Sequence, residues 1–122
     1  METDPQAYLR ALTQIYFGLP ETPRRLSRYD RQVALEWFHQ QIPLPVVEAA
    51  FLLASVRRTC RLPQARPLGP IRSLAYFQPV IEELLENPAP EGYLQYLRFK
   101  LRRIIDKADS AAAQKPMQAQ SV

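Results

Sequence analysis

Side chains that commonly carry acid–base or nucleophilic chemistry are scarce in this sequence, which contains one histidine and one cysteine. His39 follows Phe38 with no nucleophile motif around it, and we interpret it as a residue near a helix C-terminus, where the helix dipole favours it. Cys60 lies close to Arg58 and Arg61. Neighbouring cations favour the reactive thiolate, although an ordinary thiol at a helix end is the simpler interpretation.

Acidic residues offer a second set of candidates, since paired carboxylates can hold a metal or act as acid and base. Glu82, Glu83 and Glu86 are clustered but have no histidine nearby, so we interpret them as a solvated helical face. The GxxxxGK[ST], GxGxxG and HExxH patterns do not occur. The sequence therefore predicts a protein that is not an enzyme and that uses no cofactor or metal. An enzymatic role would require Cys60 or His39 in a pocket beside a carboxylate.

Arginine is the residue type that stands out. Sixteen basic residues oppose twelve acidic ones, giving a net charge of +4, and thirteen of the sixteen are arginines. The planar guanidinium suits phosphate, carboxylate and aromatic partners better than the lysine ammonium does. A moderate basic excess of this kind is compatible with binding to a polyanion.

The arginines gather in three places. One cluster precedes and begins the second expected helix, a second lies in or beside residues 59–70, and a third forms a basic face on the last expected helix. The clusters are Arg24, Arg25, Arg28 and Arg31; Arg57, Arg58, Arg61, Arg66 and Arg72; and Arg98, Lys100, Arg102, Arg103 and Lys107.

From the second and third clusters we predict contacts to nucleic-acid phosphates. The predicted contacts are Arg57, Arg58, Arg61, Arg66, Arg72, Arg98, Arg102 and Arg103. One alternative is that the arginines solvate a small helical domain and pair with Glu48, Glu82 and Glu86. Another is that the basic terminal helix docks on an acidic protein partner.

Helices are expected throughout, because no segment alternates apolar and polar residues and no Asn-Gly or Asp-Gly hairpin turn occurs. Twelve prolines then separate the helices. The first helix is expected to start with Asp4 as N-cap and Pro5 as its first residue and to end at Gly18. The second spans about residues 28–41, with a capping box formed by Ser27 and Asp30.

The segment VVEAAFLLASVRR predicts a central, mostly buried helix, on which Glu48, Ser55 and Arg58 mark the exposed side. Residues 59–70 then form a long surface loop rich in proline and arginine, the type of segment in which function is often found. A fourth helix spans about residues 72–86. Pro79 lies inside it, so this helix is either kinked or split.

The last helix is expected over about residues 90–107, and from residue 109 the composition becomes polar and poor in large apolar side chains. We therefore predict an all-α fold, a compact bundle of about five helices in one domain (1–108) followed by a disordered tail (109–122). No segment is apolar enough to span a membrane, and we expect a cytoplasmic protein. Its oligomeric state stays open.

Residues 29–85 resemble the C-terminal domain of DnaD-like replication proteins. The family's helix pair is matched by Trp37, Ile42, Val46, Val47, Ala49 and Ala50. Tyr76, Val80 and Leu84 follow its YxxxIxxxW signature, with leucine in the position of the tryptophan. The resemblance implies a helical module that binds DNA and helps to assemble a replication complex. Combined with the arginine clusters, it predicts a small, non-catalytic protein that binds DNA or RNA as a replication or mobile-element accessory.

Overall fold

The computed structural model describes the backbone of residues 4–60 and 68–120, and the side chains of these residues up to 107. Within them the chain forms five α-helices and one 3-10 turn, with no strand, which confirms the predicted all-α fold. The elements are α1 (Pro5–Phe17), α2 (Arg28–His39), α3 (Leu44–Thr59), η1 (Leu74–Phe77), α4 (Gln78–Glu86) and α5 (Tyr93–Gln120).

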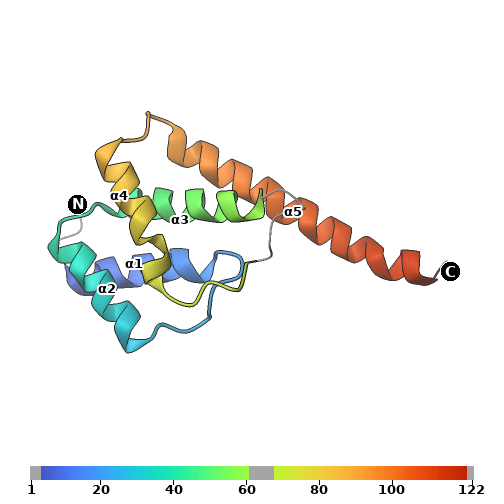
Figure 1. Ribbon diagram of the computed structural model, residues 1–122, viewed down its shortest axis with the longest axis horizontal. Helices are drawn as coiled ribbons and strands as arrows, with labels where there is room; N and C mark the ends of the chain where they lie inside the picture. Colours follow the sequence, from blue (N-terminus) through green and yellow to red (C-terminus); the bar gives the residue numbers. More distant parts are fainter. Residues whose placement is uncertain (1–3, 61–67, 121–122) are drawn as a thin grey trace.

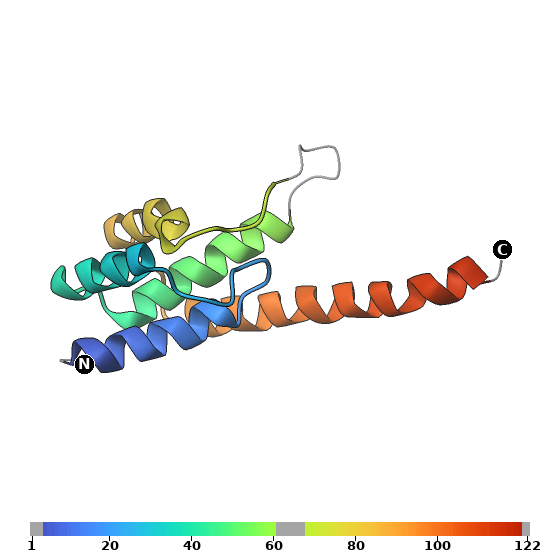
Figure 2. The same cartoon turned by 90° about the horizontal axis from the view of Figure 1, so that it is seen from below.

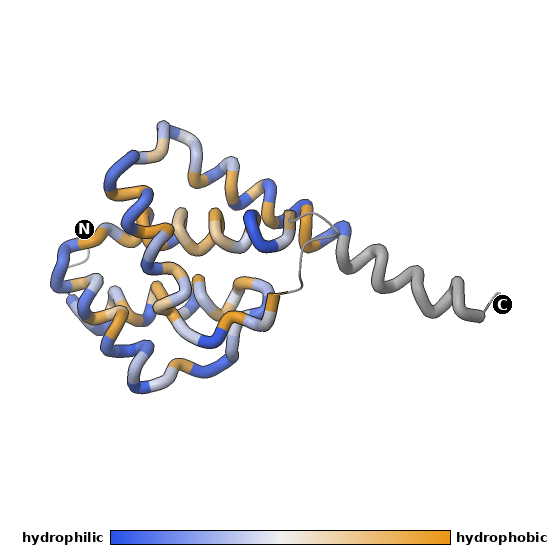
Figure 3. The backbone as a smooth tube through the Cα atoms, viewed as in Figure 1, coloured by the Kyte–Doolittle hydropathy of each residue, from blue (hydrophilic) through white to orange (hydrophobic). Residues whose placement is uncertain are grey.

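Helix α3 occupies the middle of the bundle, as predicted, and packs against α1, α4, η1 and α5 (Figure 1). Its residues from Ala49 to Val56 are all buried. Figure 3 shows a largely hydrophobic α3, whereas α5 alternates between hydrophilic and hydrophobic positions. The expected exposed side of α3 is wrong at two positions. Ser55 is buried and the Arg58 side chain is only 5% exposed, because α1, α4, η1 and α5 pack around α3 and Arg58 contacts Tyr76 and Gly69.

The predicted starts of the first two helices are confirmed. The Asp4 carboxylate accepts a hydrogen bond from the Gln6 backbone N–H at 3.1 Å, and Pro5 is the first helical residue. Ser27 and Asp30 form a reciprocal capping box, in which each side chain accepts a hydrogen bond from the other residue's backbone N–H. These caps satisfy N–H groups that have no partner within their own helix.

Asp30 also connects α2 to a distant part of the chain. Its Oδ1 accepts a hydrogen bond from the Leu74 backbone N–H at 2.9 Å, while its Oδ2 accepts from Ser27. The side chain is almost fully buried. A buried carboxylate with both oxygens hydrogen-bonded fixes the start of α2 against η1.

Pro79 splits the fourth helix rather than kinking it. Leu74–Phe77 form the 3-10 turn η1, and α4 starts at Gln78 with Pro79 in its first turn. Proline is tolerated in a first turn because no intrahelical partner awaits its missing N–H. The Trp37 indole N–H donates to Gln78 Oε1 at 2.7 Å and holds the junction against α2.

The last helix starts at Tyr93 rather than near Pro90, because Gly92 adopts a left-handed φ of 85° that a helix cannot include. Figure 2 shows α5 running beside α3, where Leu97 and Leu101 are buried. Helix α5 extends to Gln120, past Lys107. The expected boundary between the domain (1–108) and the disordered tail (109–122) stays a prediction, because the side chains from residue 108 onwards lie outside the described residues.

No helix among the described residues is long and apolar enough to cross a bilayer.

Candidate functional site

Two of the predicted phosphate contacts are engaged with glutamates of the chain itself. The Arg57 guanidinium donates to both carboxylate oxygens of Glu83, at 2.9 and 2.6 Å. Arg98 donates in the same two-fold manner to Glu48, at 2.8 and 2.7 Å. The hydrogen bond to Arg57 lowers the pKa of Glu83, and the carboxylates raise the pKa of both arginines. Each of these arginines would have to leave its partner to bind a phosphate.

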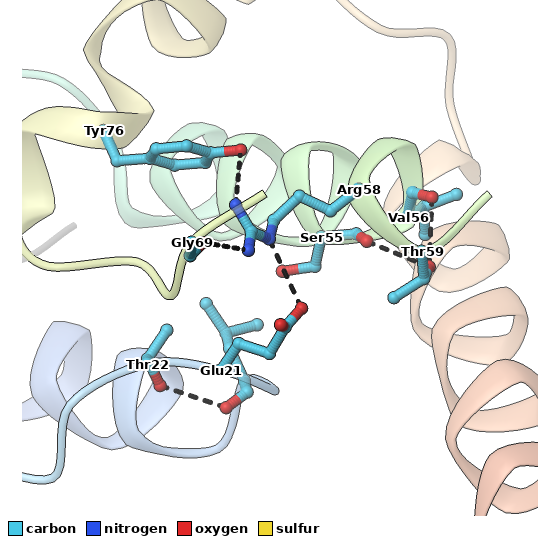
Figure 4. Close-up of polar contacts among 9 residues, drawn as sticks. Glu21, Thr22, Ser55, Val56, Arg58, Thr59, Gly69 and Tyr76 are labelled. Atoms are coloured by element: carbon cyan, nitrogen blue, oxygen red, sulfur yellow. Dashed lines mark hydrogen bonds and ion pairs between the residues drawn. The ribbon is translucent and has the colours of Figure 1, made fainter. Parts of the chain in front are cut away.

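Arg58 is held even more firmly by residues from three other segments (Figure 4). Its guanidinium donates to the Gly69 carbonyl at 2.6 Å and to the Tyr76 hydroxyl at 3.3 Å. It also pairs with Glu21 at 3.4 Å and lies 5.4 Å from the centre of the Tyr76 ring. Arg58 therefore joins α3 to η1 and to the segments that follow α1 and precede η1, which is a structural role.

The remaining predicted contacts divide into two groups. Arg61 and Arg66 lie outside the described residues. Arg72, Arg102 and Arg103 are exposed, and none of them forms an ion pair with another described residue. Arg103 lies over the Phe99 ring, 5.7 Å from its centre. Among the described contacts, Arg57, Arg58 and Arg98 are thus paired with glutamates of the chain, whereas Arg72, Arg102 and Arg103 are not.

The residues considered for catalysis lie apart from one another. His39 is exposed and packs edge-on against Phe38, and Cys60 is exposed where α3 ends. Among the described residues, no group of three or more histidines, cysteines and carboxylates lies close enough to hold a metal ion. A hollow of about 380 Å³ lies beside Arg57, Arg58 and Tyr76, but it includes neither His39 nor Cys60.

A different set of arginines lines one surface, which we call the basic groove. It lies between α1 and the segment that leads into α2, has a volume of about 650 Å³, and contains no acidic side chain. Its lining residues are Gln6, Leu9, Arg10, Thr13, Gln14, Phe17, Arg24, Arg25, Leu26 and Arg31. The groove is therefore lined by four cations together with polar and apolar side chains.

Local sequence fixes the walls of the basic groove. The Thr22 hydroxyl donates to the carbonyls of Tyr16 and Leu19, at 2.9 and 3.0 Å, and so folds the connecting segment back onto α1 (Figure 4 shows Thr22). Glu21 takes a left-handed φ of 62° at this turn. Leu26 packs against the core, and the capping box then starts α2. The Thr22 hydrogen bonds thus fix the backbone before Arg24 and Arg25, and the capping box fixes the backbone before Arg31.

The electrostatics of the basic groove favour an anion. Arg10, Arg24, Arg25 and Arg31 are exposed and form no ion pair with any other described residue. Their combined formal charge of four equals the net charge of the entire chain. Guanidinium groups bind phosphate oxygens in a two-pronged geometry. An arrangement of this kind suits an anionic ligand.

Sequence reasoning found this surface only in part. Arg24, Arg25 and Arg31 were noted as a cluster, but they were not among the predicted phosphate contacts, and Arg10 was missed. The sequence does contain a pattern that includes Arg10. Gln6, Arg10, Thr13 and Gln14 are polar and share one face of α1 at helical spacing. Which face of α1 meets the loop follows only from tertiary packing.

Comparison with protein-family models, curated proteins and solved structures gives no match. The resemblance to DnaD-like proteins therefore stays a prediction. Tyr76, Val80 and Leu84 lie across the junction of η1 and α4, where Tyr76 contacts Arg58 and Leu84 is buried.

Proposed function

We propose that the chain is a non-catalytic nucleic-acid-binding module that holds a phosphate backbone in the basic groove. The observation that supports this proposal is the gathering of Arg10, Arg24, Arg25 and Arg31 around one groove without an acidic lining residue. An unopposed positive surface of this kind attracts polyanions and releases their counterions on binding.

The shape of the groove favours an extended polyanion over a small one. Its arginines come from α1, from the connecting segment and from the first turn of α2, so the charge is distributed along the walls. A volume of about 650 Å³ is far more than a single phosphate ion fills. A polynucleotide backbone presents repeated phosphates, which match several separated guanidinium groups.

The test measures binding of a short duplex by fluorescence anisotropy over a series of salt concentrations. Arg24→Ala and Arg31→Ala should each weaken binding and reduce the slope of log affinity against log salt by about one, because each removes one phosphate contact. Arg102→Ala removes an exposed arginine from α5 and should leave the slope unchanged. Circular dichroism should show that all three variants stay folded, since the three side chains are exposed.

Two results would contradict the proposal. Wild-type protein that binds neither duplex nor single strand even at about 50 mM salt would remove nucleic acid from consideration. Equal effects of Arg24→Ala and Arg102→Ala would show that binding follows total charge rather than the groove.

A finer role as a replication or mobile-element accessory is part of the proposal and rests on the DnaD-like pattern at Tyr76, Val80 and Leu84. A second candidate function, docking of an acidic protein, is favoured by the exposed cations Arg102, Arg103 and Lys107 on α5. Pull-down with and without nuclease separates the two. A protein partner retained after nuclease treatment supports docking, and loss of all captured material supports nucleic acid.

A further inference from the structure

One face of α5 carries five aromatic and basic residues, which we call the aromatic–basic stripe. Each member lies three or four positions from at least one other member, so they share one face of the helix. Leu97 and Leu101 point the opposite way, into the core. The stripe consists of Tyr96, Phe99, Lys100, Arg103 and Lys107.

Two large aromatic rings are exposed on this stripe. Phe99 is 61% exposed, the highest value among the exposed large hydrophobic side chains of the described residues, and Tyr96 is 51% exposed. Neither is one of the buried core residues or of the partly buried residues packed against them. A single exposed aromatic side chain is ordinary, but two on one helix face with cations beside them need an explanation in terms of binding.

The cations of the stripe lie over the rings. Lys100 Nζ is 5.8 Å from the centre of the Tyr96 ring, and Arg103 Cζ is 5.7 Å from the centre of the Phe99 ring. The Tyr93 and Tyr96 rings are stacked, with centres 6.0 Å apart and planes 23° apart. The stripe therefore places aromatic rings and positive charge within a few ångströms of each other.

We propose that the aromatic–basic stripe binds single-stranded polynucleotide, with bases stacked on Tyr96 and Phe99 and phosphates held by Lys100, Arg103 and Lys107. Aromatic stacking beside a basic track is the general means of binding single strands. In a duplex the base faces are covered by their neighbours, so the rings would have nothing to stack on. An acidic peptide would engage the cations and leave the rings exposed.

This inference rests on the proposed function and specifies that α5 binds single-stranded rather than double-stranded nucleic acid. The basic groove contains four arginines and a single aromatic residue, Phe17, so it suits a backbone of either kind. Helix α3 packs against both α1 and α5 and lies between them (Figure 1). The two surfaces therefore lie on different elements and can be altered separately.

The experiment measures anisotropy of three labelled probes with the full chain: an oligo-dT of about 16 nucleotides, an abasic strand of the same length, and a duplex. Tyr96→Ala and Phe99→Ala should each weaken oligo-dT binding about tenfold, since stacking contributes about 1–3 kcal/mol per base. Neither should change binding of the abasic strand or the duplex. Oligo-U should behave like oligo-dT, because the stripe contacts bases and phosphates rather than sugars.

Two control variants accompany the changes in the stripe, one for the aromatic rings and one for the cations. Leu85→Ala removes a side chain that is 47% exposed on α4 and should leave oligo-dT binding unchanged. Arg102→Ala lies on α5 outside the stripe and should weaken oligo-dT binding less than Arg103→Ala does. Because the two rings are exposed, their removal should leave the circular dichroism spectrum and thermal unfolding unaltered.

The outcomes separate this inference from the proposed function. Duplex binding that depends on Arg24, together with oligo-dT binding that is indifferent to Tyr96 and Phe99, overturns the stripe and leaves the groove intact. Binding of oligo-dT through the rings without any effect of Arg24→Ala on duplex overturns the groove and supports the stripe. A polyglutamate peptide that binds with the same dependence on Phe99 overturns the stripe as a nucleic-acid surface in favour of an acidic protein partner.

Discussion

Arg57 and Arg58 are adjacent in the sequence and differ sharply in environment. Arg57 forms an exposed ion pair with Glu83, its side chain being 52% exposed, whereas the Arg58 side chain is 5% exposed and has partners on three segments. An exposed pair is weakened by solvent, while a buried guanidinium leaves unsatisfied groups behind when it is removed. Adjacent residues of one type therefore serve unequal roles.

We predict that Arg58→Ala lowers the free energy of unfolding by about 2 kcal/mol, because it removes charge-assisted hydrogen bonds from a nearly buried site. Arg57→Ala should cost less than about 1 kcal/mol, as is usual for exposed pairs. Denaturant titration followed by circular dichroism measures both values.

Arg58→Lys serves as the control for charge. Lysine keeps the positive charge but loses the fork that reaches Gly69 and Tyr76 together, so most of the loss should remain. Equal costs for Arg57→Ala and Arg58→Ala would contradict this account of the Arg58 contacts.

The partners of Arg58 explain why its environment could not be predicted from the sequence. Helical spacing gives the face of α3 on which Arg58 lies, but Glu21, Gly69 and Tyr76 reach it from distant parts of the chain. Arginine in a loop-flanking cluster indicates positive charge near the surface. It does not indicate whether the charge is already neutralised by the fold.

At the scale of single elements, the sequence predicts those helix starts that depend on neighbouring residues. The starts at Asp4 and Ser27 depend on residues within one turn, and both predictions are confirmed. The split at Pro79 was one of two alternatives, and contacts from Trp37 and Asp30 hold the observed one in place. The start at Tyr93 was missed because it depends on the backbone conformation of Gly92.

The capping box of α2 connects helix stability to the basic groove. We predict that Ser27→Ala costs about 1 kcal/mol of unfolding free energy, the usual value for the loss of an N-cap. It should also weaken duplex binding modestly, because the first turn of α2 places Arg31 on the groove wall. Denaturant titration and anisotropy measure the two effects.

Ser27→Asn provides the matched control, since asparagine is an equally good N-cap. It should retain both stability and binding. A Ser27→Ala variant that loses stability without any change in duplex affinity would show that the groove does not depend on how α2 begins.

At the scale of the whole molecule, the fold class was predictable and the surface was not. Apolar periodicity and proline positions specify helices and a central α3, since burial of apolar faces drives the bundle together. The basic groove joins Arg10 to residues 24–31 across a turn held by Thr22. Such a surface forms only when α1 and α2 have packed together. Clusters of arginines along the sequence therefore did not include Arg10.

Two buried tyrosines make global stability sensitive to alkali. Burial raises the pKa of Tyr8 and of Tyr16 from 10.0 to about 12, and the charge of Asp30 adds to the shift at Tyr16. The folded state thus retains phenolic protons that the unfolded chain releases above pH 10. The stabilisation is complete below pH 10 and is lost as the pH rises from 10 towards about 12.

We predict that Tyr16→Phe makes this alkaline loss of stability shallower. At neutral pH the change should cost little, because the Tyr16 hydroxyl has no hydrogen-bond partner among the described residues. Tyr8→Phe should cost about 1 kcal/mol at neutral pH, because the Tyr8 hydroxyl donates to the Ile42 carbonyl at 2.8 Å. Unfolding free energies measured from neutral to alkaline pH give both quantities. A wild-type and a Tyr16→Phe protein with parallel pH profiles would contradict this account of Tyr16.

The small residues of α3 have a consequence for how this protein can diverge over evolutionary time. Ala49, Ala50, Ala54 and Ser55 are buried where α3 meets its neighbours, and a larger side chain at Ala50 or Ser55, which are almost completely buried, would force the surrounding helices apart. Exposed arginines and aromatic rings carry no such constraint from packing. Descendants of this sequence should therefore preserve the spacing of small residues in α3 while their surface chemistry drifts, and distant relatives will be recognised by that spacing first.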